Sequence, residues 1–275
     1  MNKRIDNNNM PEAIETITVS GIRFHCIDVT ELRRLILQAT ETPSPSVIAN
    51  VNVHAVNLAH KHHWFRDFLN RADVVFCDGF GVLLGAWLLG WKVKLSYRMT
   101  APDYLDGVAA MLEAAGKSLF LLGGEPGVAE NAAAMLQAKF PRLAIEYHHG
   151  YFAKHGVENA AVVEAVNRAA PDLLMVGFGM PLQERWIADN LPALNVRAVM
   201  PLGAFLDHYT GRSYRGPRWL NAHGFEWLAR LVSEPRRLCK RYAVGNPLFF
   251  ARVLAERWQR RRDVRSSSAK DANHR

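Results

Sequence analysis

Short apolar runs and segments of helical periodicity alternate along this chain from residue 16 onward. The apolar and β-branched runs predict strands, which are Ile17–His25, Val47–Val51, Val74–Cys77, Ser118–Leu122, Ala144–Tyr147, Leu173–Val176 and Arg197–Met200. The segments between them predict helices, which are Glu31–Ala39, Val53–Leu69, Val82–Leu89, Pro102–Ala115, Val128–Lys139, Val157–Ala169 and Leu182–Asn190. Because strands that alternate with helices form parallel sheets covered on both faces, we expect an α/β fold with a Rossmann-like, doubly wound, mostly parallel sheet.

The pattern changes after Met200, where aromatic and basic residues become frequent. Two helices are expected there, Gly224–Val232 and Pro247–Arg262, and both contain aromatic and arginine side chains. Such cationic helices are typical of a membrane surface, and the alternative is a helix packed on the body with its arginines in water. The predicted organisation is a disordered N-terminus (1–15), an α/β body that carries the site (16–211), a basic membrane-associating helical appendage (212–262) and a disordered tail (263–275).

Charge is distributed unevenly between these parts. Residues 1–211 contain 18 Lys and Arg against 21 Asp and Glu, whereas residues 212–275 contain 16 against 5, within a net charge of +8 for the chain. A slightly acidic body with a strongly basic C-terminal part predicts a polyanionic partner for that part. Anionic lipid, a lipid diphosphate and nucleic acid all satisfy this condition.

The three cysteines, Cys26, Cys77 and Cys239, are widely spaced and odd in number. This spacing argues against a disulfide framework or a structural zinc site, and it favours a reducing compartment. Residues 1–15 lack the apolar core of a signal peptide. The longest uncharged stretch, from Gly79 to Trp91, is shorter than the ~20 residues of a spanning helix. A cytoplasmic location is therefore expected.

Polar residues and glycines follow several predicted strands directly, where open α/β sheets bind their ligands. They are Asn50, Asn52, Asp78, Gly79, Gly123, Gly124, Glu125, Gly177, Gln183 and Glu184. Asp78 is suited to general-base chemistry on a hydroxyl, although an N-cap of the next helix is an equally ordinary use of aspartate, and the two asparagines have the same ambiguity. The glycines allow close approach of a phosphate or simply form tight turns, and Gly-Gly-Glu-Pro-Gly is not the dinucleotide fingerprint.

A metal site is not expected. The histidines at His60, His62 and His63 have no carboxylate or cysteine at ligand spacing, and the chain has no Asp-x-Asp pair to hold a cation against a diphosphate. A diphosphate leaving group would then need arginines to offset its charge. Candidates in the basic C-terminal part are Arg230, Arg237, Lys240 and Arg241.

Eight motifs in order resemble the WecG/TagA/CpsF family of glycosyltransferases, glycosyltransferase family 26, over roughly residues 45–245. The motifs are the strand end at Asn50–Asn52, RADVVFCDGFGV (71–82), Arg98 followed by Asp103, FLLGGEPGVAE (120–130), HGYF (149–152), PDLLMVGFGMPLQERWI (171–187), the RGP segment (215–217) and FEWLARLVSEPRR (225–237). It is the ordered set, rather than any single motif, that is specific.

The resemblance implies an inverting, metal-independent transfer from a UDP-sugar donor to an undecaprenyl-diphosphate-linked saccharide, without a cofactor. In this reading Asp78 is the general base. The resemblance assigns Arg98, Gln183 and Asp103 to the donor pocket, together with the other strand-end residues. It assigns the donor phosphates to Arg230, Arg237, Lys240 and Arg241. The enzyme would bind peripherally to an anionic membrane surface, at the inner face of the cytoplasmic membrane. Members of the family can self-associate, so a homo-oligomer is one of the possible states.

The sequence departs from the family pattern at Asn50, where threonine is usual, and at Leu182, where lysine is usual. These departures leave the donor sugar open between a hexose and an N-acetylhexosamine, with exopolysaccharide synthesis as one setting. Two other classes remain as alternatives: a nicotinamide-dependent Rossmann oxidoreductase, which the missing fingerprint argues against, and a nucleic-acid-binding protein, which lacks a reading motif. No nucleic-acid partner is expected.

Overall fold

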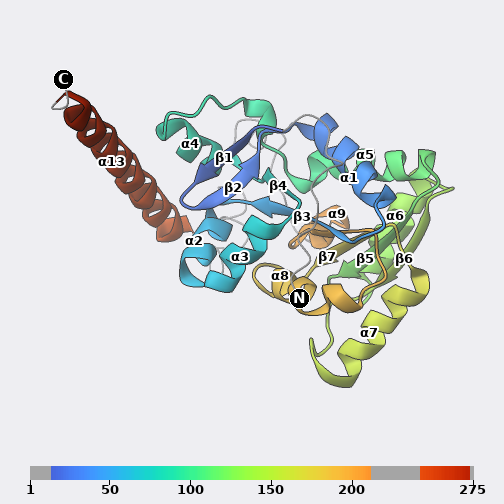
Figure 1. Cartoon of the computed structure of the whole chain (residues 1–275). Coiled ribbons are helices and arrows are strands. Elements are labelled where there is room, and N and C mark those ends of the chain that lie inside the picture. The colour runs from blue at the N-terminus through green and yellow to red at the C-terminus, as the bar shows by residue number, and fades with distance from the viewer. Residues whose placement is uncertain (1–13, 212–241, 273–275) are drawn as a thin grey trace.

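The computed structural model describes residues 14–211 and 242–272, with side chains for all of these except 101–103 and 264–272. A parallel six-stranded sheet forms its centre, in the order β4-β3-β8-β7-β5-β6 (Figure 1). Its strands are β3 (Ser46–Val51), β4 (Val74–Cys77), β5 (Ser118–Gly123), β6 (Ala144–His148), β7 (Leu173–Gly177) and β8 (Ala198–Pro201). The Rossmann-like α/β fold expected from the sequence is confirmed.

Helices cover both faces of the sheet, because neighbouring residues of each strand point to opposite sides. In β5, Leu119 and Leu121 pack into one core, and Phe120 and Leu122 pack into the other. The first core is covered by α1 (Val29–Glu41), α5 (Ala101–Ala114), α6 (Val128–Lys139) and α9 (Phe205–Tyr209). The second is covered by α2 (Val53–Lys61), α3 (His63–Arg71), α4 (Phe80–Leu88), α7 (Gly156–Ala169) and α8 (Leu182–Asn190).

Two predicted elements are divided in the structure. The single strand predicted over Ile17–His25 is a hairpin of β1 (Thr16–Val19) and β2 (Ile22–His25), whose turn has positive φ at both Ser20 and Gly21. The helix predicted over Val53–Leu69 breaks at His62, which has an extended backbone and separates α2 from α3. The short helices Leu95–Tyr97, Leu191–Ala193 and α9 were not predicted, since one turn carries little periodicity.

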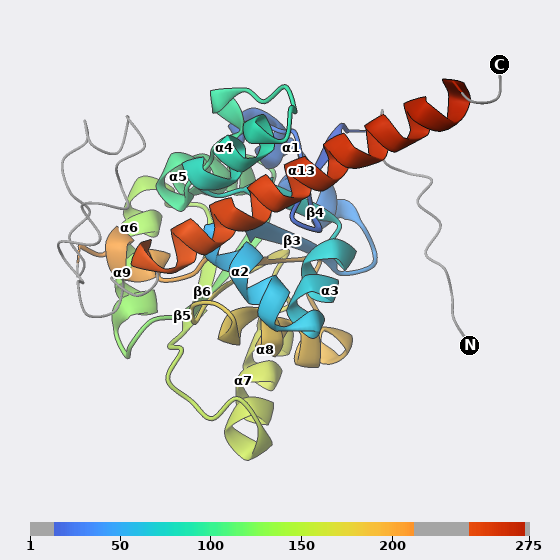
Figure 2. The ribbon, with the colours of Figure 1, turned by 90° about the vertical axis from the view of Figure 1, so that its left-hand side faces the viewer.

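The C-terminal helix α13 (Gly245–Ala272) contacts α2 and α4 and then extends away from the body (Figures 1 and 2). The predicted helix over 247–262 is present, but the tail predicted as disordered from residue 263 is helical as far as Ala272, since no Gly or Pro interrupts it. Phe249 and Val253 are buried in the core beside α4. Gly85 permits this approach, because a Cβ there would lie 2.7 Å from Cζ of Phe249.

The connections of the sheet diverge between β5 and β7. From β5 the chain passes through α6 on one face to β6, and from β7 it passes through α8 on the other face to β8. This is a topological switch point, where the loops after the two strands separate and leave a crevice. The topology therefore predicts a ligand site at the carboxyl ends of β5 and β7.

Candidate active site

The carboxyl edge of the sheet brings most of the predicted site residues together in two groups. Asn50, Asn52 and Asp78 lie at the ends of β3 and β4. Arg98 joins them, because its backbone forms a bridge with Cys77 at the end of β4. The second group consists of Gly123, Gly124, Glu125 and Gly177 at the ends of β5 and β7. Asp103 belongs to the first turn of α5, and its side chain is outside the described part.

Asp78 is held by the neighbouring strand. Its backbone N–H donates to the carbonyl of Val51 over 2.8 Å, and its Oδ2 accepts a hydrogen bond of 3.2 Å from Nδ2 of Asn52. The Oδ1 of Asn52 accepts from the N–H of Ala55 over 3.0 Å and so caps α2. α4 begins after its N-cap residue Gly79, which has a φ of +107°. Asp78 therefore precedes the N-cap position of α4 by one residue.

Asn50 is buried on the side of β3 that carries Ile48. Within the described part of the chain, its Oδ1 has no hydrogen-bond partner although it is shielded from solvent. Buried amide oxygens nearly always accept a hydrogen bond, because leaving one unpaired costs about 1–3 kcal/mol. An acceptor without a partner at the end of β3 is suited to a ligand hydroxyl or N–H.

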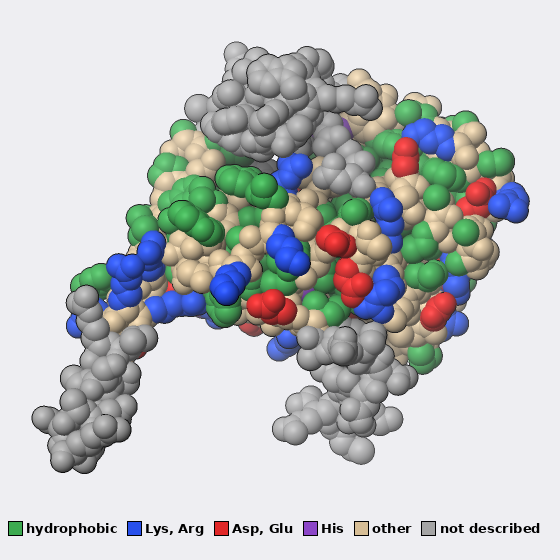
Figure 3. All heavy atoms as spheres, turned by 90° about the horizontal axis from the view of Figure 1, so that it is seen from above, with side chains coloured by type: hydrophobic (Ala, Val, Ile, Leu, Met, Phe, Trp, Pro, Cys, Tyr) green, Lys and Arg blue, Asp and Glu red, His purple; other side chains and the backbone are tan. Residues whose placement is uncertain are grey.

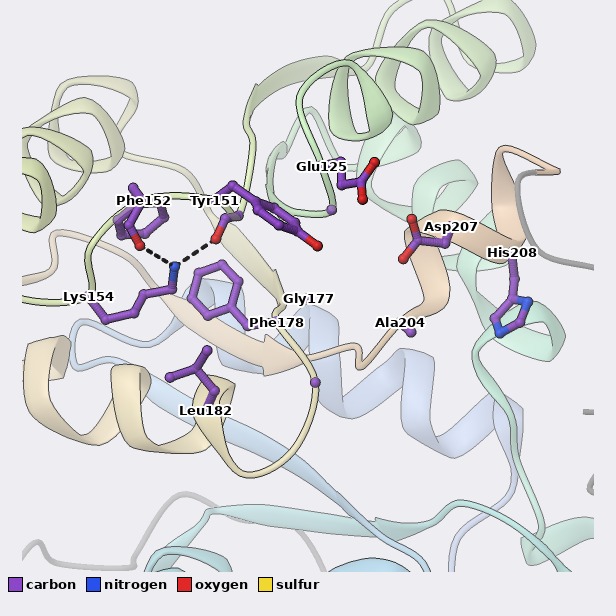
Figure 4. A pocket seen from close by; sticks show the side chains of 13 residues that line it. Glu125, Tyr151, Phe152, Lys154, Gly177, Phe178, Leu182, Ala204, Asp207 and His208 are labelled. Carbon is purple, nitrogen blue, oxygen red and sulfur yellow. Dashed lines mark hydrogen bonds between the residues drawn. The ribbon is translucent and has the colours of Figure 1, made fainter. Parts of the chain in front are cut away.

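A pocket of about 920 Å³ opens at the switch point. This volume is within the ~300–1,000 Å³ typical of small-molecule sites. The residues that line it come from the loops after β5, β6, β7 and β8 (Figure 4): Gly124, Glu125, Gly150, Tyr151, Phe152, Lys154, Gly177, Phe178, Gly179, Leu182, Ala204, Asp207 and His208. The pocket is therefore built where the topology predicts a ligand.

Two glycines let the strand ends approach each other beside this pocket. A Cβ on Gly123 would lie 2.5 Å from the carbonyl oxygen of Gly177, and a Cβ on Gly177 would lie 2.9 Å from that of Gly203. Neither distance can be relieved by a side-chain movement, since the opposing atoms are backbone. Glycine is thus required at Gly123 and Gly177 by the packing of β5, β7 and the loop after β8.

The walls of the pocket combine an exposed aromatic ring with carboxylates. Tyr151 is 66% exposed, and Figure 4 shows its side chain, Glu125 and Asp207 directed toward the same space. Carboxylates repel phosphate and accept hydrogen bonds from hydroxyl or N–H groups, and an exposed ring can stack on a planar base. This end of the site is therefore suited to a nucleoside.

Gln183 lies behind the pocket wall and is completely buried. Its Oε1 accepts from the N–H of Gly179 over 3.2 Å and from the N–H of Gly203 over 2.9 Å, so it joins the loops after β7 and β8. Its Nε2 donates to Oε1 of Glu184 over 2.8 Å. Burial raises the pKa of Glu184 to about 7, and its Oε2 has no hydrogen-bond partner among the described residues. Gln183 therefore supports the two loops, and neither side chain is among those that line the pocket.

The pocket residues that were not predicted from the sequence include Tyr151, Lys154, Phe178, Asp207 and His208. The motif HGYF contained Tyr151, but nothing local indicated that its ring would face Asp207 from a different loop. Arg230, Arg237, Lys240 and Arg241 lie outside the described residues, so their assignment to phosphate stays a prediction. Across residues 14–211 and 242–263, no group of three or more His, Cys, Asp or Glu side chains is placed to hold a metal ion.

Comparison with known proteins gives the family. The sequence model of the glycosyl transferase WecG/TagA/CpsF family matches residues 17–263. Relatives include the N-acetylglucosaminyldiphosphoundecaprenol N-acetyl-beta-D-mannosaminyltransferases of Staphylococcus aureus strains MRSA252, MW2 and NCTC 8325. Each is 26% identical over 215 residues, which are 78% of this chain and 82% of the relative. The chain, with its strand-end carboxylate and its pocket at the switch point, belongs to the WecG/TagA/CpsF family of glycosyltransferases.

Proposed function

We propose that this protein is an inverting, metal-independent glycosyltransferase that moves a sugar from a UDP-sugar onto an undecaprenyl-diphosphate-linked saccharide. Family membership and the names of the relatives support glycosyl transfer to such an acceptor, and they favour it over the oxidoreductase and nucleic-acid-binding alternatives. The observation that carries the proposal is the division of the carboxyl edge into a nucleoside-like pocket and a separate carboxylate, Asp78.

The separation of these two parts sets the shape of the donor. Asp78 follows β4, and the pocket is centred on β5 and β7, which stand three to four strand positions away. With strands about 4.8 Å apart, this corresponds to roughly 15–19 Å. An elongated donor spans that distance, with its nucleoside near Tyr151 and Asp207, its diphosphate over the strand-end loops from Gly123–Gly124 onward, and its sugar near Asp78.

In the proposed reaction Asp78 removes the proton of an acceptor hydroxyl, whose oxygen attacks C1 of the donor sugar. The bond from C1 to the UDP oxygen breaks on the opposite face, which inverts the anomeric centre. Asn52 holds the carboxylate of Asp78 toward the acceptor, and Asn50 is placed to accept a hydrogen bond from a sugar hydroxyl. Arg98, and the arginines at 230 and 237 with Lys240 and Arg241, offset the charge that develops on UDP.

A lipid-linked acceptor requires contact with a membrane. Among the described residues no helix is long and apolar enough to span one. Large apolar side chains are exposed at Trp87 and Leu95 on the α4 side of the body, and at Leu254 and Trp258 on α13. Seen from above, hydrophobic side chains gather on the α4 side of the body and basic side chains gather where α13 leaves it (Figure 3). We propose that this surface rests on an anionic membrane, peripherally and at the inner face of the cytoplasmic membrane.

The test measures UDP release from a panel of UDP-sugars, with and without a lipid-diphosphate-linked sugar, in EDTA. The wild type should release UDP only with a matched acceptor, and Asp78→Asn should reduce that rate at least 100-fold, as loss of a general base does. Asp207→Asn should instead raise the KM for the donor. Release that requires a divalent cation, or near-normal transfer by Asp78→Asn, would contradict the mechanism.

A further inference from the structure

The side chain of Lys154 donates hydrogen bonds to the backbone of its own loop, which connects β6 to α7. Its ammonium group donates to the carbonyl oxygen of Gly150 over 2.6 Å and to that of Phe152 over 2.8 Å (Figure 4). Both acceptors flank Tyr151 in the sequence. The backbone on either side of the exposed tyrosine is therefore fixed by a single cation.

The same ammonium group also joins this loop to the loop after β7. It lies 3.7 Å from the centre of the Phe152 ring and 4.4 Å from that of Phe178, a geometry of strong cation–π attraction. The two rings meet edge to face with their centres 5.7 Å apart, and Phe178 makes the same contact with Trp186 of α8. Lys154 is thus the polar centre of an aromatic row that reaches the core.

A third attachment ties the loop to β5. The N–H of Gly150 donates to the carbonyl oxygen of Gly124 over 2.7 Å. Tyr151 is therefore carried by a backbone held to the loops after β5 and β7, while its own ring is 66% exposed and lines the pocket. The position of the ring depends on these attachments, because the hydroxyl of Tyr151 makes no hydrogen bond with any residue that the structure describes.

In this position the ammonium group of Lys154 is partly removed from water. Burial lowers the pKa of Lys154, against a partial opposing effect of Glu158. The carboxylate of Glu158 accepts from the N–H of Ala153 over 2.7 Å, so it also holds the loop. A lysine with no part in the loop geometry would extend into water instead.

We propose that Lys154 is a positioning residue for the nucleotide donor: its cation holds the Gly150–Phe152 backbone so that Tyr151 presents its ring to the base. This inference rests on the proposed function, in which the pocket receives the nucleoside. It assigns no contact between Lys154 and the reacting atoms. Loss of the cation should therefore weaken donor binding and leave the chemical step unchanged.

The experiment compares wild type with Lys154→Met, Lys154→Arg, Tyr151→Ala and the double variant. Lys61→Met is the control, since Lys61 is an exposed lysine at the end of α2. UDP binding is measured by calorimetry, and KM and kcat are measured for the donor. Lys154→Met should weaken UDP binding and raise the donor KM about tenfold with kcat within twofold, as loss of uniform binding does. Lys154→Arg, which keeps the cation, should recover most of the binding.

The double variant decides whether the effect acts through Tyr151. If it does, Lys154→Met adds less than twofold in the Tyr151→Ala background, because the ring it positions is already gone. The inference would be overturned if Lys154→Met weakened UDP binding by the same factor in both backgrounds, or if it behaved like Lys61→Met. Neither result would contradict the assignment of the pocket to the donor. Absence of UDP binding by the folded wild type would overturn the proposed function and this inference with it.

Discussion

Asn52 and Asp78 come from two neighbouring strands and meet at the carboxyl edge of the sheet, where Nδ2 of Asn52 lies 3.2 Å from Oδ2 of Asp78. The oxygen of the same amide is engaged by the N–H of Ala55 at the start of α2. Because this cap requires an acceptor, the amide can face Asp78 only with its nitrogen. The helix start therefore fixes the orientation of a donor that favours the ionised carboxylate of Asp78.

Replacing Asn52 by aspartate should separate these two roles. Asn52→Asp keeps an oxygen for the cap but puts a second carboxylate beside Asp78, which raises the pKa of Asp78. We expect the acid limb of the pH profile of kcat/KM to move upward by about 1 pH unit or more, while the helix cap is kept. Asn52→Ala should instead lower the free energy of unfolding by about 1 kcal/mol through loss of the cap. An acid limb that does not move in Asn52→Asp would contradict the pairing.

Gln183 should prove to be a structural tie between two loops of the pocket. Gln183→Ala removes the acceptor of the N–H groups of Gly179 and Gly203, so we expect a loss of about 3 kcal/mol in the free energy of unfolding and weaker UDP binding. Urea denaturation and calorimetry measure the two effects. Gln137→Ala on the exposed face of α6 is the matched control and should change neither. Full stability of Gln183→Ala would show that the two loops are held by other contacts.

Most of the fold could be predicted because its signals are local. α6 and α8 have the predicted bounds, since each is a periodic segment that starts just after a strand-end loop containing Gly and Pro. The turn at Ser20–Gly21 was missed because two residues barely interrupt the apolar pattern of the hairpin. The break at His62 carries no Gly or Pro.

The site was predictable only in part, for a related reason. Asp78 and Asn52 could be placed at one edge because all parallel strands end on the same side. The convergence of Tyr151 with Asp207 depends on β7 standing between β5 and β8, and this strand order is set by packing of the whole sheet. No spacing within the sequence encodes it. The same holds for Gln183, whose two partners are fixed by the loops after β7 and β8.

Glu184 should make the free energy of unfolding depend on pH. Its carboxyl group has a pKa of about 7 in the folded protein, above the ordinary value of 4.5, because burial disfavours the charged form. The folded protein therefore binds more protons than the unfolded chain between these values. The stabilising contribution of the protonated carboxyl group to the free energy of unfolding is fully present below pH 4.5 and is lost as pH rises through 7. At about 1.4 kcal/mol for each pKa unit, the loss is about 3 kcal/mol.

Glu184→Gln tests this dependence, because glutamine stays neutral and its oxygen can still accept from Nε2 of Gln183. We expect the variant to be more stable than wild type at pH 8 and similar at pH 4.5, as measured by urea denaturation. Glu164→Gln on the exposed face of α7 is the control. If the free energy of unfolding changes with pH in the same way in wild type and in Glu184→Gln, the buried carboxyl group is not the source of the pH dependence.

α13 should be held to the body chiefly by its apolar face. Phe249 is fully buried against α4, and polar contacts reinforce it: Nδ2 of Asn57 donates to the carbonyl of Gly245 over 2.7 Å, and the N–H of Ser20 donates to Glu256 over 2.9 Å. Phe249→Ala removes a large core side chain at a cost of about 3–5 kcal/mol. Amide hydrogen exchange in residues 245–262 should therefore accelerate strongly, whereas Leu254→Ala, on the exposed side of the same helix, should leave it unchanged. If Phe249→Ala keeps the protection of wild type, the hydrogen bonds from Asn57 and Ser20 are sufficient to hold the helix, and the exposed apolar side chains of α13 are positioned by polar contacts.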